Sequence, residues 1–143
     1  MKKKITSLLA LMLVFVSIFT LSSCLNTVDA DGVWESATYR RDMTFGNGSK
    51  TITVAVEAGD GKVVFTVKTD KTNLADALTE HGIIAGEITE FGLSVYTVNG
   101  MTANFNTENV YWALYEGEAY ANGGASDIEI ADGNSYRFVY SAF

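Results

Sequence analysis

Residues 51–68 read TITVAVE, AGDG and KVVFTVK, and this stretch decides the fold class. In both flanking runs, β-branched and apolar residues alternate with polar ones, which is the period of a strand with one buried face. The four residues between the runs hold two glycines and an aspartate, which are typical of a tight turn. The stretch therefore predicts a β-hairpin.

A short helix is predicted just after the hairpin, over residues 73–81. Thr72 or Asn73 can cap its first turn, and Gly82 stands where a helix end favours a left-handed residue. Apolar side chains recur at helical spacing and form one stripe, at Leu74, Ala77 and Leu78. The predicted helix can therefore lie across one face of a sheet.

Further alternating runs predict strands at residues 93–98, 110–115, 127–130 and 135–140. Asn-Gly, Gly-Gly and Asp-Gly turns separate them. The order of hairpin, helix and several strands predicts one α+β domain over residues 34–143. Its sheet is expected to be small and mostly antiparallel, with one helix.

The first 24 residues have the pattern of an exported lipoprotein. Three lysines precede an uncharged apolar run at residues 5–21, and the sequence LSSC that ends at Cys24 resembles the bacterial lipobox. We therefore expect a signal peptide over residues 1–23, a lipid on Cys24 and a polar tether over residues 24–33. The domain would then lie on the outer face of a bacterial membrane. A retained spanning helix is the competing interpretation, because about 20 apolar residues suffice to cross a bilayer.

Charge excludes a nucleic-acid partner. The 143 residues carry a formal net charge of −7, from 10 basic and 17 acidic residues. Cleavage before Cys24 would remove 23 residues, three of them lysines, so 7 basic residues would remain against 17 acidic ones and the charge would be −10. Phosphate binding needs a basic patch. The single cysteine also excludes an internal disulfide framework.

Five segments carry a resemblance to a known family. They are TDKTNLADAL (69–78), VNG (98–100), YWALYEGE (111–118), GGAS (123–126) and ADGNSY (131–136). Together they resemble the transcobalamin-like C-terminal domain family, which includes bacterial surface lipoproteins and the β-rich domain of animal cobalamin carriers. The resemblance implies a β-grasp-like fold over residues 34–143 and cobalamin or another corrinoid as the ligand. In the animal carriers this domain closes over cobalamin held by a larger helical domain, which has no counterpart in these 143 residues.

Candidate binding residues lie on the aromatic strand at 110–115 and in the turns after it. Aromatic side chains with a polar end suit flat ligands and protein partners alike, although small domains also use them to build a core. Glycine turns let a ligand approach the backbone, and glutamates nearby disfavour an anionic ligand. Strand alternation places Trp112 toward the core and Tyr115 toward solvent. The candidates are Tyr111, Trp112, Tyr115, Glu116, Gly117, Tyr120, Gly123 and Gly124.

Two functions of different class remain open at this point. One is a ligand-binding module for cobalamin or another corrinoid, and the other is a cell-surface protein-interaction or adhesion module without a small ligand. Catalysis is not expected, because no nucleophile elbow, phosphate loop or cysteine-histidine metal cluster is present in the sequence. The single histidine, His81, is interpreted as a helix-terminal residue, with axial ligation of a corrin cobalt as the alternative.

Overall fold

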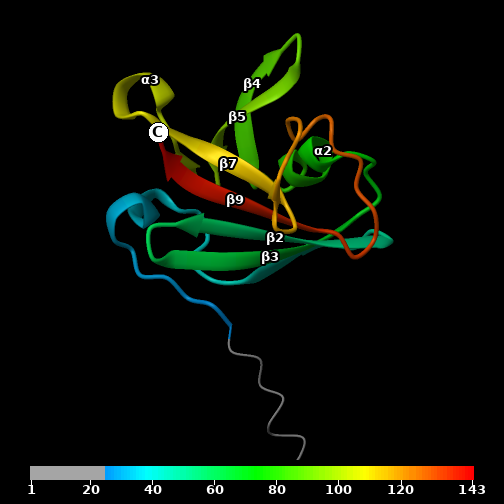
Figure 1. Ribbon diagram of the computed structural model, residues 1–143. Helices are drawn as coiled ribbons and strands as arrows, with labels where there is room; N and C mark the ends of the chain where they lie inside the picture. The colour runs from blue at the N-terminus through cyan, green and yellow to red at the C-terminus, as the bar shows by residue number, and fades with distance from the viewer. Residues whose placement is uncertain (1–24) are drawn as a thin grey trace, which may run out of the picture.

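The computed structural model describes residues 25–143, so Cys24 and the predicted signal peptide lie outside the described residues. This part of the chain is mostly β with few and short helices, and its strands form two sheets (Figure 1). The elements in chain order are η2 (Gly32–Ser36), β1 (Met43–Gly46), β2 (Lys50–Ala58), β3 (Gly61–Thr69), α2 (Leu74–Thr79), β4 (Ile84–Thr89), β5 (Gly92–Val98), β6 (Met101–Thr102), α3 (Phe105–Glu108), β7 (Val110–Glu116), β8 (Ala119–Tyr120) and β9 (Ser135–Ala142).

The larger sheet has six strands in the order β1-β3-β2-β9-β7-β8. The predicted hairpin is confirmed as β2 and β3, whose pairing ends at Ala58 and Gly61 on either side of a two-residue turn. The C-terminal strand β9 runs parallel to β2 and antiparallel to β7. It therefore joins the hairpin to the aromatic strand in the middle of the sheet.

One face of this sheet holds the hydrophobic core. Alternate residues of β2, β3 and β9 point to it, as strand geometry requires, and Val54, Phe65 and Phe138 are almost fully buried there. Helix α2 and the second sheet lie on this side (Figure 1). Each large apolar side chain buried in this way contributes about 1.5–3 kcal/mol.

Helix α2 confirms the predicted helix, with slightly narrower bounds. The Asn73 side chain caps it by accepting a hydrogen bond from the Asp76 amide at 2.8 Å. The Leu74 amide donates to the Ile128 carbonyl at 3.0 Å, which satisfies another group at the helix N-terminus. The predicted strand at 127–130 is wrong, because this segment is a loop whose isoleucines are buried and whose backbone serves the end of the helix.

The prediction of a single helix is also wrong. Residues 105–108 form the one-turn helix α3, and Gly32–Ser36 forms a 3₁₀ helix. The Asn104 side chain caps α3 by accepting from the Thr107 amide, and Asn109 ends it in the left-handed conformation with φ of 54°. Helix α3 is therefore marked in the sequence only by its capping residues, because it has no stripe of apolar side chains.

The segment before Trp34 packs along the domain. Asn26 and Asp42 exchange backbone and side-chain hydrogen bonds, and the Val28 amide donates to the Arg40 carbonyl at 2.8 Å. The indole of Trp34 is buried and donates to the Ala58 carbonyl at 2.9 Å. The packed part of the chain therefore begins before the predicted domain boundary at Trp34.

A buried asparagine explains the VNG segment. Asn99 is 1% exposed and has a positive φ of 52°. Its side chain accepts from the Tyr39 amide at 3.0 Å and donates to the Tyr39 carbonyl at 2.7 Å. These bonds satisfy a polar group that would be costly to bury alone, and they hold the segment around Tyr39 against the second sheet.

Helices long and apolar enough to cross a membrane do not occur within residues 25–143.

Candidate functional site

A hollow lies between the β4–β5 hairpin and the loop that follows β8. Its inner part has a volume of about 230 Å³ and is lined by residues of β5, β7 and the loop. An outer, more open part of about 740 Å³ extends along the hairpin to Gly124 and Asp127. Both parts share Leu93, Ser94 and Gly124 in their linings, so they adjoin each other, and together they are called here the hollow.

The hairpin supplies an apolar wall to the hollow. Ile88 pairs with Leu93 across the two strands, so both side chains lie on the same face. Leu93 and Val95 pack against the core on that face, whereas Ile88 is 79% exposed farther out. Phe91, in the turn, is 82% exposed. Figure 1 shows that the end of this hairpin projects away from the large sheet. The projecting end therefore exposes two large apolar side chains, Ile88 and Phe91, to solvent.

A glycine and a serine position this hairpin. At Gly86 the pairing with β5 is irregular, and a Cβ atom there would lie 1.7 Å from the Ser94 carbonyl oxygen. Only glycine permits that approach. On the other side of β5, the Leu93 amide donates to the Ser126 hydroxyl at 3.0 Å. The hairpin is thus bent at its base and tied to the loop across the hollow.

The Gly123-Gly124 turn forms the wall opposite the hairpin. The Gly124 amide donates to the Asp127 carboxylate at 3.3 Å, and a Cβ atom on Gly124 would lie 4.0 Å from the Leu93 carbonyl oxygen. The backbone of the turn therefore approaches β5 closely. The structure brings together Trp112, Tyr120, Gly123 and Gly124 of the predicted site residues.

Trp112 lies on the inner face of β7, as the alternation predicts. It is 7% exposed, its indole donates to the Met101 carbonyl at 3.0 Å, and its ring meets Tyr140 edge to face at 5.2 Å. Burial raises the pKa of the Tyr140 hydroxyl, and so does the nearby charge of Glu108. Trp112 therefore serves the core and closes the inner end of the hollow.

The other predicted residues lie elsewhere. Tyr111 and Tyr115 point to the opposite face of the six-stranded sheet, which is the face without α2. The Tyr120 ring packs edge to face on Tyr115 at 5.4 Å and therefore also lies on that face, although residue 120 borders the hollow. Glu116 ends β7 and Gly117 follows it in the turn to β8, and neither residue lines the hollow.

Sequence reasoning missed the hairpin wall. The sequence predicts no strand within residues 83–92, because Gly86 interrupts the alternation that β4 otherwise shows between Ile84 and Ile88. The usable signal was the pair of large apolar residues, Ile88 and Phe91, flanked by glutamates in a segment rich in glycine.

His81 does not line the hollow. Its ring lies 5.6 Å from the ring of Phe45, and its Nε2 atom is 3.8 Å from the Glu80 carboxylate. It follows the last turn of α2, which fits the helix-terminal interpretation. Groups of three or more metal-ligating side chains are not found within residues 25–143.

Comparison with known proteins supports the fold. Neither a protein-family model nor a curated protein sequence matches the chain. A proposed metal-binding protein of Ruminococcus gnavus ATCC 29149 is similar in structure, with a TM-score of 0.63 and 29% identity over 66% of this chain and 99% of that chain. Haptocorrin in complex with Cbi is similar with a TM-score of 0.55 and 18% identity, over 69% of this chain and 27% of that chain. At the level of the fold, the chain therefore resembles a part of a cobalamin carrier, in agreement with the resemblance seen in the sequence.

Proposed function

We propose that this protein is an extracytoplasmic binding module, anchored by a lipid on Cys24, whose hollow takes cobalamin or another corrinoid. The observation that carries the proposal is the exposed Ile88 beside Leu93, facing the hollow across from the Gly123-Gly124 turn. A flat ligand seated there would cover apolar side chains that are otherwise exposed to water, at about 25 cal/mol for each Å² of apolar surface covered.

The open shape of the hollow suits contact with one side of a ligand. Its inner part is small, and its outer part is bounded only by the hairpin and by Gly124 and Asp127. Ligand sites combine apolar walls with a few polar groups, which Ser94 and Asp127 would supply here. The structural similarity to haptocorrin in complex with Cbi supports the choice of a corrinoid, and with it the β-grasp-like, transcobalamin-like classification. The proposed activity is binding without catalysis.

A surface protein-interaction module is the second candidate. Phe91 is 82% exposed in the turn at the end of the hairpin, where an aromatic side chain can insert into a partner. A protein seated on the hairpin would bury Ile88 and Phe91 together and need no small ligand.

Equilibrium dialysis of the full chain in detergent against cyanocobalamin and dicyanocobinamide tests the proposal, with the visible corrinoid bands as the readout. Ile88→Asp puts a charge on the apolar wall of the hollow and should weaken binding at least tenfold. Ala85→Asp adds the same charge to the same strand at an exposed residue that does not line the hollow, so it should leave binding unchanged.

Three results would count against this function. Failure of the unsubstituted protein to retain either corrinoid would remove the corrinoid as ligand. Equal binding by the Ile88→Asp and Ala85→Asp variants would remove the hollow as its site. Recovery of a protein partner that depends on Phe91, without any corrinoid binding, would favour the second candidate.

A further inference from the structure

A second exposed surface lies on the face of the six-stranded sheet opposite the core. Five aromatic side chains form a continuous row on it, called here the aromatic strip: Phe105, Phe143, Tyr111, Tyr120 and Tyr115. Ring centroids are 4.6 Å apart for Phe105 and Phe143, 4.5 Å for Phe143 and Tyr111, and 5.4 Å for Tyr120 and Tyr115. Hydrogen bonding with the Tyr111 hydroxyl, followed by burial, raises the pKa of Tyr120.

The exposed rings of the strip are supported by less exposed ones. Phe105, Tyr120 and Phe143 are 54%, 58% and 72% exposed. Phe143 stacks on half-buried Tyr111, and Tyr120 stands on half-buried Tyr115. Both supporting tyrosines belong to β7, which is paired with β9 along its length. The exposed rings are therefore held in place before any partner arrives, which lowers the entropy cost of binding.

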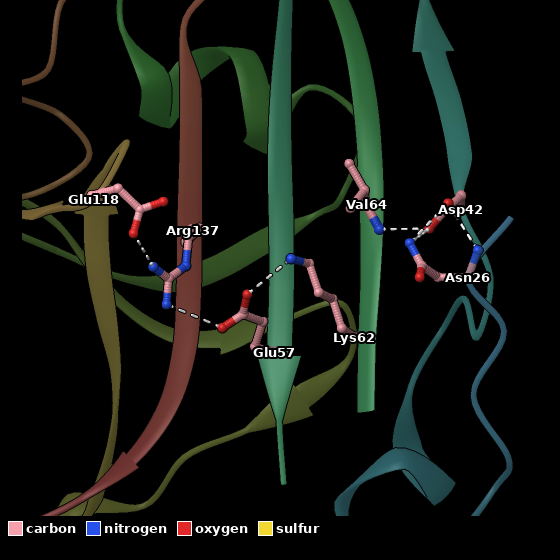
Figure 2. Close-up of polar contacts among 7 residues, drawn as sticks. All are labelled: Asn26, Asp42, Glu57, Lys62, Val64, Glu118 and Arg137. Carbon is pink, nitrogen blue, oxygen red and sulfur yellow. Dashed lines mark hydrogen bonds and ion pairs between the residues drawn. The ribbon is translucent and has the colours of Figure 1, made fainter. Parts of the chain in front are cut away.

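A fixed set of charged groups adjoins the strip. The Arg137 guanidinium lies 4.9 Å from the centre of the Tyr115 ring. Its two terminal nitrogens lie 3.2 Å from Glu57 and 3.5 Å from Glu118, and Lys62 lies 3.4 Å from Glu57 (Figure 2). Figure 2 shows these side chains running across β9, β2 and β3 in one line. Donors and acceptors thus stand side by side next to aromatic rings.

The charges around the strip exclude several partners. Beside the strip, the carboxylates of Glu57 and Glu118 pair with Arg137 and Lys62, so this group of charges is balanced. Anionic polymers and anionic lipid surfaces bind to basic patches, and these paired charges do not form one. The core of a protein interface is depleted of charged residues. Here the line from Glu118 to Lys62 crosses the open face of the sheet, so a partner of neutral and strongly hydroxylated chemistry fits better.

We propose that the aromatic strip binds a neutral glycan chain. A sugar ring has apolar C–H faces and a rim of hydroxyl groups. The C–H faces can stack on Phe143 and Tyr120, whereas the hydroxyls can bond to the tyrosine phenols and to the Arg137–Glu118 pair. An extended polymer also matches a row of rings on an open sheet better than a small ligand does. Apart from Tyr120, which also borders the hollow, the residues of this site lie on the other face of the sheet from the proposed corrinoid site, and the proposal does not rest on that function.

Affinity electrophoresis of the full chain in detergent tests this proposal. The gels contain soluble starch, xylan, mixed-linkage β-glucan or galactomannan, and heparin serves as the anionic comparison. We expect at least one neutral polysaccharide to retard the protein and heparin to have no effect. Phe143→Ala and Tyr120→Ala should each reduce the apparent affinity at least tenfold. Both side chains are exposed, so the melting temperature should remain close to that of the unsubstituted protein.

Matched controls separate this site from the hollow. Tyr96→Ala removes an exposed tyrosine of β5, outside the strip, and should leave retardation unchanged. Ile88→Asp should also leave it unchanged, whatever it does to corrinoid binding. The proposal is overturned if none of the four neutral polysaccharides retards the protein, or if both strip variants migrate like the unsubstituted chain. A component captured from an extract would instead show a protein partner, in place of a glycan, if its capture depends on Tyr120, survives periodate treatment and is abolished by protease.

Discussion

Alanine replacement of Trp112 and of Tyr115 tests which face of β7 carries the core. The two side chains are three positions apart on the same strand and point to opposite faces. Trp112 is 7% exposed and hydrogen-bonded to the Met101 carbonyl, whereas Tyr115 is half-buried under the Arg137 guanidinium and the Tyr120 ring. The pair therefore compares a core aromatic residue with a surface one in the same strand.

The expected loss of unfolding free energy is about twice as large for Trp112→Ala as for Tyr115→Ala. Truncation of a buried tryptophan to alanine costs about 3–5 kcal/mol, and the loss includes the hydrogen bond to Met101. Tyr115 loses a partly exposed cation–π contact of about 0.5–1 kcal/mol. It also loses one aromatic pair of about 0.5–1.5 kcal/mol. Tyr115→Ala should therefore cost about 1–2.5 kcal/mol.

Urea unfolding, followed by circular dichroism, measures both losses, with Trp112→Phe as the control. Phenylalanine keeps an aromatic ring but cannot donate to Met101, so it should cost about 1–3 kcal/mol, the penalty for leaving one buried carbonyl unpaired. The face assignment is refuted if Tyr115→Ala destabilises the protein as much as Trp112→Ala does. Unfolding by both alanine variants would show that the whole strand is structural and would remove Tyr115 from the glycan-binding surface.

Three further predictions follow from single features. Gly86→Ala should loosen the β4–β5 hairpin, because its Cβ would overlap the Ser94 carbonyl, and faster amide exchange at residues 86–95 together with weaker corrinoid retention would show this. Burial raises the pKa of the Tyr136 and Tyr140 hydroxyls above the value of about 10 that they have in the unfolded chain. The two neutral tyrosines therefore contribute their full share to the free energy of unfolding below about pH 10, and this share is lost as the pH rises through the folded-state pKa values. The urea midpoint should accordingly stay constant up to about pH 9 and fall above about pH 10, and a constant midpoint beyond that range would contradict the assignment. Cys24→Ala should abolish incorporation of labelled palmitate and partition into detergent, and a variant that still carries the label would exclude Cys24 as the anchor.

Local signals in the sequence predicted the elements that depend on neighbouring residues. The β2–β3 hairpin and helix α2 follow from alternation, turn residues and a cap within a few positions. The strand β4 was not predicted, because Gly86 interrupts its alternation of apolar and polar residues. A strand was wrongly predicted at 127–130 because two isoleucines alternate there with acidic residues. These isoleucines are buried in a loop whose backbone accepts a hydrogen bond from the N-terminus of α2. Both errors arise where tertiary contacts override a short local pattern.

The candidate site was predictable only in part, for the same physical reason. The opposite orientations of Trp112 and Tyr115 follow directly from strand alternation, and the structure agrees with them. The hollow depends on β5 lying beside β7 and on the tie between Leu93 and Ser126, which are long-range contacts without a local signature. The aromatic strip likewise requires the parallel pairing of β9 with β2 and the return of Phe143 to Tyr111.

The positions of the two proposed sites bear on how an anchored protein could use them. Figure 1 shows that the blue segment at the start of the described chain runs along the side of the domain opposite the β4–β5 hairpin. A lipid on Cys24 would therefore hold the far side of the domain at the membrane and leave the hollow directed outward. The aromatic strip and the hollow lie on opposite faces of β7, with Tyr111 and Trp112 as adjacent residues. A glycan could thus occupy one face while a ligand occupies the other, and the two sites could be coupled through β7 or through Tyr120 of β8, which borders both. If the affinity for each ligand is the same with and without the other ligand, the coupling free energy between the two sites is close to zero.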